Sequence, residues 1–538
     1  MSSVLDEVLE GYEPAPELVS LMAGSKTAAV LALDIGTSGV RASLFDENGV
    51  ELDGETIRTR QTFSRIGDLA VTDADAIFDL VTETIDTLFS RPFHSASQIQ
   101  LIAISCVWHS LMGVNAEGCA TTPVFTWADT RAAGSIKELR SRFDEVAVHS
   151  RTGCRFHPSY WPAKLLWLRS TDPQTVDKTD CWLSFGEYVV LRLSGQTEAS
   201  VSMASGTGLF NQRLLQWDRE LCEGLSIPGS NLPDISSTGQ ACAQLRIEYV
   251  ARWPMLGEAR ISPPIGDGAA NAIGSGCTTR EQVALMIGTS AAMRVLYEGE
   301  PPSELPASLW CYRADRDRVV VGGALSDGGN LHHWIKEMLL LNGDSEALEA
   351  ALAELEPDAH GLTVLPFWGG ERSTGWSPDA RGAILGLTLH TETLEILRAA
   401  MEGIAYRFAL IARDLDRVAP AASIIASGTA LRSSPVWTQI IADVLGRSLL
   451  VPESYETSAR GAALLALEAA GKIQSITDLP VGVARTCEPN MSRHLIYKKA
   501  LELGAKDEGA AGPRGQGFYA GYFRDPDGNK LVAFYMGG

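Results

Sequence analysis

The apolar positions along the chain follow two kinds of pattern. Short apolar runs over 28–34, 40–45 and 99–106 end at small or polar turn residues, which is typical of buried β-strands. Over 74–89 and 392–418 the apolar residues instead recur at intervals of three and four, which predicts helices with one buried face. Strands interleaved with helices predict an α/β protein.

A second strand–turn–strand segment occurs in the latter half of the chain. An apolar strand over 283–287 leads into Gly288-Thr289-Ser290, which echoes the earlier Gly36-Thr37-Ser38. Both copies follow one apolar run and precede another, so the sequence predicts a duplicated unit, one in each of two lobes. Chance similarity in a glycine-rich chain is the alternative.

Further elements are predicted towards the end of the chain. The apolar runs 424–426 and 449–451 predict two more strands. Between them, Ser433 or Ser434 is expected to cap a helix that stops at Gly446. An Ala-rich helix is expected over residues 457–470.

The length of 538 residues exceeds what one hydrophobic core holds, and an apolar content of 45% is enough for two. We expect four parts: an N-terminal extension, a first lobe, a second lobe and a tail, over 1–27, 28–265, 266–497 and 498–538. The first residues lack the basic start of a signal peptide, and no apolar run has the roughly 20 residues of a membrane helix. A cytoplasmic protein without a membrane partner is expected.

The charge of the chain restricts its partners. The formal net charge is −21, from 45 basic and 66 acidic residues, which disfavours a nucleic acid or an acidic membrane as partner. A nucleotide is not excluded, because backbone N–H groups can hold phosphates. The nine cysteines form no CxxC pair, so reduced thiols are expected rather than a zinc site.

The small residues Gly36, Thr37 and Ser38 let backbone N–H groups approach a phosphate closely, and their hydroxyls can bond its oxygens. Asp34, at the end of the preceding strand, can hold Mg²⁺ through water. Gly288-Thr289-Ser290 would hold the same polyphosphate from the second lobe. An ordinary tight turn is the alternative for each loop.

A third turn of small residues, Ser427-Gly428-Thr429, lies between a strand and a capped helix, where a ligand can approach the backbone. Gly461, in the Ala-rich helix, would offer a flat wall for an adenine ring. Close helix packing through glycine and alanine is the alternative.

Asp267 is flanked by Gly266 and Gly268, so neighbouring side chains shield its carboxylate little. It can accept the proton of a hydroxyl group that attacks a phosphoryl group. On its own, a turn or a helix cap is the better interpretation of this aspartate.

Together and in this order, these motifs resemble the FGGY carbohydrate kinase family over about residues 28–497, including a segment near the lobe hinge at 369–382. The resemblance implies two actin-like, RNase H-like lobes with ATP and Mg²⁺ in the cleft between them and the sugar mostly on the first lobe. It makes Asp267 the catalytic base. Lobe closure would then exclude water.

The resemblance also implies three segments that contact the substrate. They contain Trp108 with His109, Asp129 with Arg131, and Tyr160 shortly before Lys164. An aromatic face with imidazole, carboxylate and hydroxyl groups suits a polyol. The alternatives are core packing for Trp127 and Trp161, and a surface ion pair for Lys164.

Two departures from the family pattern bear on the substrate. Cys106-Val107 differs from many xylulokinases, and Gly268 replaces an amide side chain, which we expect to enlarge the pocket. Asp-Gly-Ala resembles the gluconate kinases of the family, so gluconate is the expected substrate, with Arg131, Lys164 or Arg372 binding its carboxylate. The alternatives are a pentulose such as xylulose or ribulose, a polyol such as glycerol, a non-catalytic sugar sensor, and an actin-like ATPase. A homodimer is a further expectation.

The tail predicts a hairpin, with strands over 518–522 and 531–535 around a strong turn at 525–529. It resembles the closing hairpin of the glyoxalase/bleomycin-resistance (vicinal oxygen chelate) family. The position of that family's metal-ligand glutamate is Val532 here, so neither metal binding nor catalysis is expected.

Overall fold

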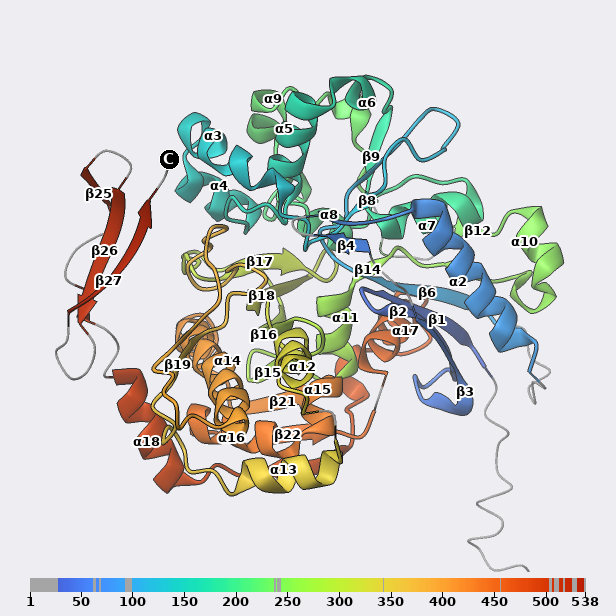
Figure 1. Cartoon of the computed structure of the whole chain (residues 1–538). Helices are drawn as coiled ribbons and strands as arrows, with labels where there is room; N and C mark the ends of the chain where they lie inside the picture. Colours follow the sequence, from blue (N-terminus) through green and yellow to red (C-terminus); the bar gives the residue numbers. More distant parts are fainter. Residues whose placement is uncertain are drawn as a thin grey trace, which may run out of the picture.

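The computed structural model contains two large β-sheets with helices around and between them (Figure 1). The predicted extension over 1–27 lies outside the described residues. The structure describes residues 28–60, 64–66, 69–91, 99–236, 239, 243–341, 343–454, 456–502, 506–507, 512–515, 518–524 and 530–536.

The first sheet is built around β1 (Val30–Gly36), whose apolar run is buried. β1 forms an antiparallel hairpin with β2 (Gly39–Phe45) and pairs in parallel with β6 (Leu101–Cys106). β3 (Glu51–Arg60) continues the sheet beyond β2. The strands on the far side of the sheet are β12 (Ala243–Gln244), β13 (Arg260–Ile261) and β14 (Ile265–Gly266).

The second sheet is built around β15 (Gln282–Ile287). β15 pairs antiparallel with β16 (Ala291–Glu298) and in parallel with β21 (Ser423–Ser427). β18 (Arg318–Leu325) follows β16. The outer strands are β17 (Trp310–Arg313), β22 (Leu449–Pro452) and β23 (Val483–Cys487).

The two sheets repeat one arrangement. The order β3-β2-β1-β6-β13 in the first sheet matches β18-β16-β15-β21-β22 in the second, with the same antiparallel and parallel pairings. The predicted duplication of a strand–turn–strand unit is therefore confirmed, and it extends to the strands on both sides of each hairpin.

The predicted helices are also confirmed, as α2 (Ala74–Phe89), α14 (Thr393–Leu415), α16 (Pro435–Leu445) and α17 (Thr457–Ala469). The Ser434 side chain caps α16 by accepting the N–H of Trp437. The other helices are α3 (Ser135–Arg142), α4 (Glu145–Thr152), α5 (Trp161–Thr171), α6 (Pro173–Asp177), α7 (Phe185–Ser194), α8 (Val201–Ser205), α9 (Arg219–Gly224), α10 (Ile247–Arg252), α11 (Asp267–Gly274), α12 (Gly329–Met338), α13 (Ser345–Ala353), α15 (Thr429–Ser433) and α18 (Met491–Glu502).

Short strands complete the structure. Their bounds are β4 (Ser64–Ile66), β5 (Leu69–Thr72), β7 (Met112–Val114), β8 (Val124–Phe125), β9 (Cys181–Leu183), β10 (Phe210–Asn211), β11 (Gln216–Trp217), β19 (Thr363–Leu365) and β20 (Ala383–Leu385). None of the helices among the described residues is both long and apolar enough to cross a lipid bilayer.

Helices α11 and α17 are in close contact through glycine. A Cβ on Gly461 would lie 1.8 Å from the carbonyl oxygen of Ala270, and one on Gly274 would lie 1.7 Å from that of Thr457. α17 also packs against the first sheet, since Leu464 belongs to the same hydrophobic cluster as Leu31. The late helix α17 thus contributes to the core of the first lobe, and the predicted lobe boundaries stay predictions.

The predicted hairpin of the tail is confirmed as β26 (Phe518–Arg524) and β27 (Lys530–Met536), paired antiparallel. Its turn over 525–529 lies outside the described residues. β24 (Lys506–Asp507) and β25 (Gly512–Gly515) also pair with β26, so the tail forms a small sheet of its own, separate from the two large ones (Figure 1).

Candidate active site

Two adjoining pockets meet at Asp267, between the two sheets. The first, here called the loop pocket, contains all three predicted small-residue turns. Its lining includes Asp34, Gly36, Thr37, Ser38, Arg41, Asp267, Gly288, Thr289, Gly428 and Thr429. The second, here called the aromatic pocket, is lined by Trp108, His109, Trp127, Asp267, Gly268, Ser290, Arg294, Trp310, Tyr312 and Arg372, among others.

The three turns come from both sheets. β15 and β21 are parallel, so their turns lie at the same edge of the second sheet, whereas the turn after β1 belongs to the first sheet. β1, β15 and β21 end at the cleft, and the turns follow at those ends. Gly428 has a φ of 99°, and a Cβ there would lie 2.3 Å from the carbonyl oxygen of Ile287, so glycine is needed. Ser290, predicted with this group, lines the aromatic pocket instead. The prediction that Gly461 forms a wall for an adenine ring is wrong. Gly461 packs against Ala270 of α11 and does not line the loop pocket.

Both carboxylate oxygens of Asp34 have partners. Oδ1 accepts a hydrogen bond from Ser105 Oγ at 2.9 Å, and Oδ2 lies 2.8 Å from Nη1 of Arg41. Because Mg²⁺ keeps most of its water shell, a carboxylate held in this way fits contact through water. The donor set of the loop pocket therefore fits the predicted Mg²⁺, with Asp34 as an outer contact.

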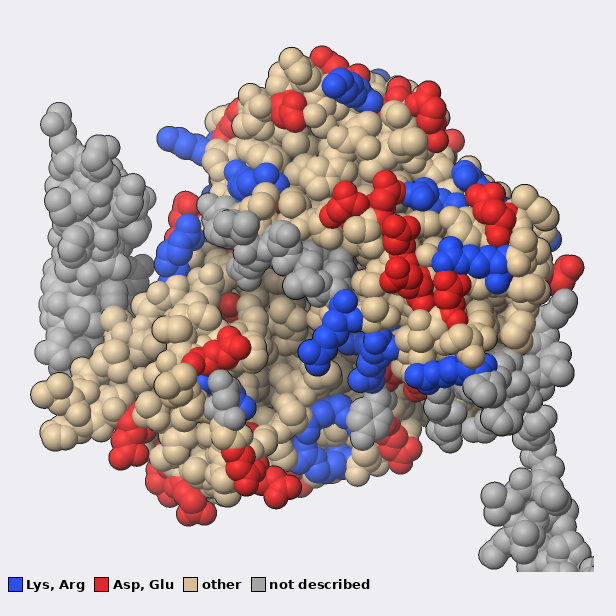
Figure 2. Space-filling model, turned by 45° about the vertical axis from the view of Figure 1, so that its right-hand side comes forward, with Lys and Arg blue, Asp and Glu red and all other residues tan. Residues whose placement is uncertain are grey.

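Basic side chains gather around the hollow in the middle of one face of the molecule (Figure 2). Arg41, Arg58 and Arg432 are part of the lining of the loop pocket. Arg41 and Arg58 form ion pairs with Asp34 and Glu456, so the lining combines both charges. The guanidinium groups that line the pocket can still donate hydrogen bonds to an anion such as a polyphosphate.

Asp267 begins α11 directly after β14, and its Oδ1 accepts the N–H of Gly268 at 2.8 Å. Loss of hydration in the cleft raises the pKa of Asp267 to about 6; the nearby Arg294 opposes this rise, and Asp34 adds to it. A carboxylate with this pKa is ionised at neutral pH and can still take up a proton, as a general base must.

The glycines beside Asp267 accommodate Trp108. A Cβ on Gly266 would lie 1.9 Å from Cε2 of the Trp108 indole, and one on Gly268 would lie 2.7 Å from its Cζ3 and 2.9 Å from Nη1 of Arg294. The prediction that Gly268 enlarges the pocket is therefore wrong, because the Trp108 ring and the Arg294 guanidinium fill that space.

His109 lies in the aromatic pocket with a φ of 68°, an uncommon conformation for a residue other than glycine. Its Nδ1 is 2.6 Å from the carbonyl oxygen of Gly206, and burial lowers its pKa to about 3. The imidazole is thus neutral and donates from Nδ1, which leaves Nε2 as an acceptor for a ligand hydroxyl.

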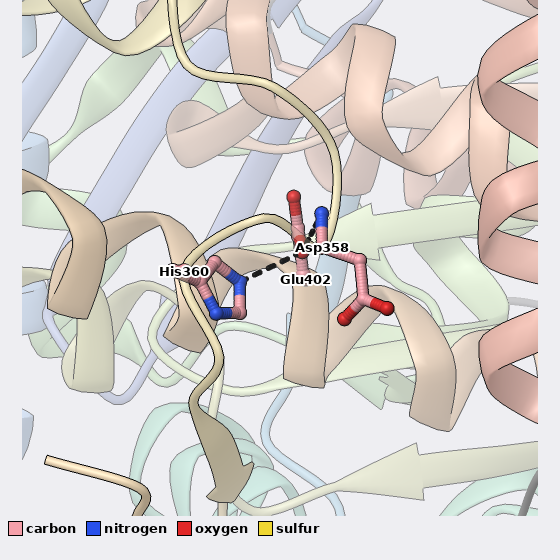
Figure 3. Close-up of side chains that lie close together, drawn as sticks. All are labelled: Asp358, His360 and Glu402. Atoms are coloured by element: carbon pink, nitrogen blue, oxygen red, sulfur yellow. Dashed lines mark hydrogen bonds and ion pairs between the residues drawn. The ribbon is translucent and has the colours of Figure 1, made fainter.

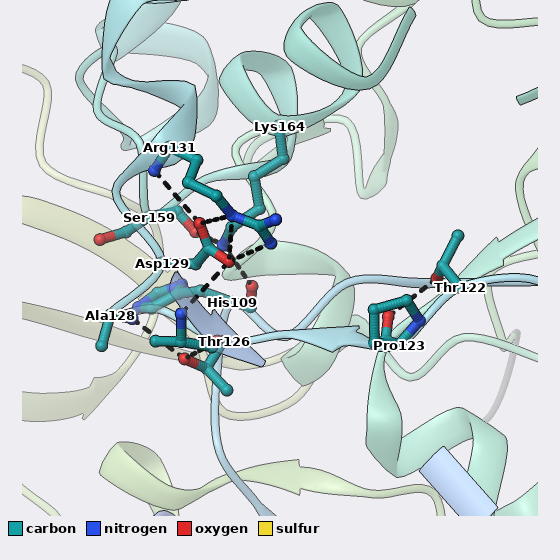
Figure 4. A network of polar contacts seen from close by, with 10 residues as sticks. His109, Thr122, Pro123, Thr126, Ala128, Asp129, Arg131, Ser159 and Lys164 are labelled. Carbon is teal, nitrogen blue, oxygen red and sulfur yellow. Dashed lines mark hydrogen bonds and ion pairs between the residues drawn. The ribbon is translucent and has the colours of Figure 1, made fainter. Parts of the chain in front are cut away.

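Asp129 and Arg131 form an ion pair with each other, 2.6 Å between Oδ2 and Nη2 (Figure 4). The Arg131 guanidinium also lies 4.6 Å from the ring centre of Trp167. Lys164 is buried and donates to the carbonyl oxygens of His109 and Ser159, which excludes the alternative of a surface ion pair. The pKa of Lys164 falls to about 7 through burial. Lys164 thus holds the backbone of His109 in place, and none of Asp129, Arg131 and Lys164 is part of the lining of the aromatic pocket.

Tyr160 does not line the aromatic pocket, but it contacts a residue that does. Its hydroxyl is 2.5 Å from that of Tyr312, which does line the pocket. Trp161 is buried in a separate cluster, so its interpretation as core is confirmed, whereas Trp127 lines the pocket.

Arg294, Trp310 and Tyr312 are among the lining residues of the aromatic pocket that the sequence did not predict. Arg294 interrupts the otherwise apolar strand β16 and is 4% exposed. An arginine inside an apolar strand was the available signal, because a buried charge needs a partner or a function. No sequence signal marked Trp310 as facing a ligand.

A cluster of Asp358, His360 and Glu402 lies apart from both pockets (Figure 3). His360 Nδ1 accepts the N–H of Leu362, so its other nitrogen, Nε2, carries the proton and donates to Glu402. Arg398 also donates to Glu402 at 2.8 Å. The protonated nitrogen and the arginine leave little for a cation to bind, and the cluster links the 358–362 loop to α14.

The chain is similar to known proteins over most of its length. Residues 29–274 match the N-terminal domain of the FGGY family of carbohydrate kinases, and residues 283–470 match its C-terminal domain. A gluconokinase from Bacillus subtilis is 28% identical, over 84% of this chain and 89% of that protein. A glycerol kinase from Trichlorobacter lovleyi is 30% identical, over 84% of this chain and 92% of that protein.

Solved structures agree with the family match. A gluconate kinase from Lactobacillus acidophilus superposes with a TM-score of 0.80 at 27% identity, covering 88% of this chain and 96% of that one. The duplicated sheets and the loops between them define a two-lobed, actin-like sugar kinase that uses ATP and a divalent metal. The chain belongs to the FGGY family of carbohydrate kinases. The matched segments end at residue 470, and the resemblance of the tail to the glyoxalase family stays a prediction.

Proposed function

We propose that this kinase transfers the γ-phosphoryl group of ATP to a hydroxyl group of a small sugar acid, with Asp267 as general base and gluconate as the best candidate. The observation that carries the proposal is the position of Asp267, which lines both the loop pocket and the aromatic pocket. A base at that junction can reach a hydroxyl on one side while the γ-phosphorus lies on the other.

The residues that line the two pockets account for the phosphoryl transfer. The turns at Gly36–Ser38, Gly288–Thr289 and Gly428–Thr429 hold the phosphates of ATP through backbone N–H groups and hydroxyls. Asp34 would hold Mg²⁺ through water, and the ion would neutralise part of the phosphate charge. The acceptor oxygen bonds to the γ-phosphorus, the bond from that phosphorus to the β–γ bridging oxygen breaks, and the hydroxyl proton passes to Asp267. ADP and the phosphorylated acid leave.

The acceptor is held by neutral and apolar groups as well as by charge. The indole rings of Trp108 and Trp310 cover C–H surface, and Nε2 of His109 accepts a hydroxyl hydrogen bond. Gluconokinases among the relatives support a sugar acid. A pentulose such as xylulose, or a polyol such as glycerol, is the alternative substrate, and a non-catalytic sugar sensor is the alternative class. A homodimer and a cytoplasmic location stay predictions.

A coupled ADP-release assay tests the proposal. The full-length chain, with ATP and Mg²⁺, is offered gluconate, other aldonic acids, xylulose, ribulose, glycerol and glucitol. We expect acceptor-dependent ADP release with the highest kcat/KM for a sugar acid. Binding of an acid without turnover would support the sensor, and ATP hydrolysis independent of every acceptor would contradict the kinase assignment.

A further inference from the structure

Three residues that line the aromatic pocket each carry a buried N–H group without a hydrogen-bond partner within the described part of the chain. These groups are Nε of Arg294, Nε of Arg372 and Nε1 of Trp310. Buried donors without partners are rare in folded proteins, because the lost hydration is not replaced. Because three such donors belong to one pocket beside Asp267, we expect the pocket to bind a ligand with several oxygen acceptors.

Both arginines are already held in place. Nη1 of Arg294 donates to the carbonyl oxygen of Gly268 at 2.6 Å, and Nη2 of Arg372 donates to that of Leu325 at 2.8 Å. The Arg372 guanidinium also lies 4.5 Å from the ring centre of Trp127. Each guanidinium is therefore anchored by one N–H while its Nε–H has no partner, so little conformational entropy is lost when a ligand binds.

The charges of the pocket are unbalanced. Two buried guanidinium groups face the Asp267 carboxylate, and the nearby His109 is neutral. Asp327 also acts on Arg372, more weakly than Asp267 does, and it is not part of the lining of this pocket. Burial lowers the pKa of both arginines, Arg294 to about 10, and both stay charged at neutral pH. A further anion would balance the second guanidinium.

We propose that Arg294 and Arg372 together bind the carboxylate of the acceptor, that Trp310 donates to one of its hydroxyls, and that Gly268 makes this possible by leaving space for Arg294. The inference deepens the proposed kinase function and rests on it. It makes these four residues determinants of specificity for an acid over the matching neutral polyol, since a neutral acceptor leaves one guanidinium unbalanced.

The test compares gluconate with glucitol, which has the same carbon chain but a hydroxymethyl group in place of the carboxylate. For the wild type we expect kcat/KM to favour gluconate by about 100-fold, the scale of a charge-assisted contact. Arg372→Gln should lose about 100-fold with gluconate and change less than about threefold with glucitol. Arg372→Lys should be intermediate, because it keeps the charge but not the planar guanidinium.

The exposed Arg316 lies in the loop between β17 and β18, outside the aromatic pocket, and gives a matched control. Arg316→Gln should leave both substrates unchanged. Unchanged ATP affinity in a binding titration would show that each variant is folded.

If the wild type phosphorylates neither acids nor neutral acceptors, the kinase proposal fails, and this inference fails with it. If it phosphorylates both at similar rates, or if Arg372→Gln lowers both equally, the carboxylate site is overturned while the kinase stands.

Discussion

The two pockets that meet at Asp267 are built differently. The loop pocket is formed by short turns of glycine, serine and threonine at the ends of β1, β15 and β21. The aromatic pocket is formed by large side chains from distant parts of the chain, including Trp108, Arg294, Trp310 and Arg372. A phosphate needs only backbone N–H groups and hydroxyls, whereas choosing among sugars needs side chains at defined positions.

We expect this difference to divide the two roles: the loop pocket binds ATP, and the aromatic pocket selects the acceptor. The turns after β1 and β15, which form part of the loop pocket, belong to the two duplicated units. They therefore resemble each other in sequence and topology. The aromatic pocket is asymmetric, because Arg294 on β16 has no charged counterpart at the matching position of β2, where Ala42 stands. We therefore expect changes in the loop pocket to alter ATP use with every acceptor, and changes in the aromatic pocket to alter the choice of acceptor.

The largest loss of activity is expected for a change of Asp267, where the two pockets meet. Asp267→Asn removes the proton acceptor and should lower kcat by at least about 100-fold with every acceptor, since a general base contributes about 10²–10⁴. ATP affinity, measured by titration, should stay nearly the same. The exposed Asp177→Asn serves as the matched control. A variant that kept more than about a hundredth of the rate would contradict the role of Asp267.

Gly268→Ala tests the aromatic pocket alone. The added Cβ would press on the Trp108 ring and on Arg294, and overpacking of this kind costs about 1–3 kcal/mol. We expect kcat/KM for the acid acceptor to fall about 30-fold with little change in the KM for ATP. Gly134→Ala, at an exposed position with open space, is the matched control. An equal loss of ATP affinity would show that the two pockets are not separable.

The pH dependence of kcat/KM should report the base. Because the pKa of Asp267 is raised to about 6, its carboxylate is ionised above that pH and protonated below it. Activity should therefore fall as the pH drops through 6 and be about tenfold lower at pH 5 than on the plateau. Arg294→Gln removes a charge that lowers this pKa, so the acid limb should move to higher pH. An acid limb near pH 4 in the wild type would speak against a desolvated base.

The smallest effect is expected in the loop pocket. Thr289→Val removes one hydroxyl from the turn after β15 and keeps the shape of the side chain. We expect the KM for ATP to rise about fivefold, the scale of a single hydrogen bond, with an unchanged ratio of gluconate to glucitol rates. A change in that ratio would contradict the expectation that the loop pocket affects ATP use without affecting the choice of acceptor.

Much of the fold could be predicted because its signals are local. The apolar runs of β1 and β15 and the stripe of α14 depend on neighbouring residues, and the caps of α16 lie within a few positions of its ends. The same is true of the small-residue turns, which identify themselves by composition and by the strand before them. Their order around Asp267 was enough to predict a kinase of this family.

The acceptor site was predicted only in part. His109 and Trp108 line the pocket, but the ion pair of Asp129 with Arg131 is not part of its lining. Gly461 packs against α11. A sequence pattern shows that a residue is unusual, not which way its side chain points.

By itself, the sequence determined the strands, the helices and the duplicated turns, because these depend on hydrophobic periodicity and on residues that adjoin one another. It also singled out Asp267 as the predicted base. The tertiary structure alone decided that Arg294, Trp310 and Arg372 converge on Asp267, that Trp108 fills the space beside Gly268, and that Lys164 is buried. The physical reason is that a pocket is assembled from segments far apart in the chain. Whether two such segments meet depends on strand pairing and on the packing of side chains across the sheets.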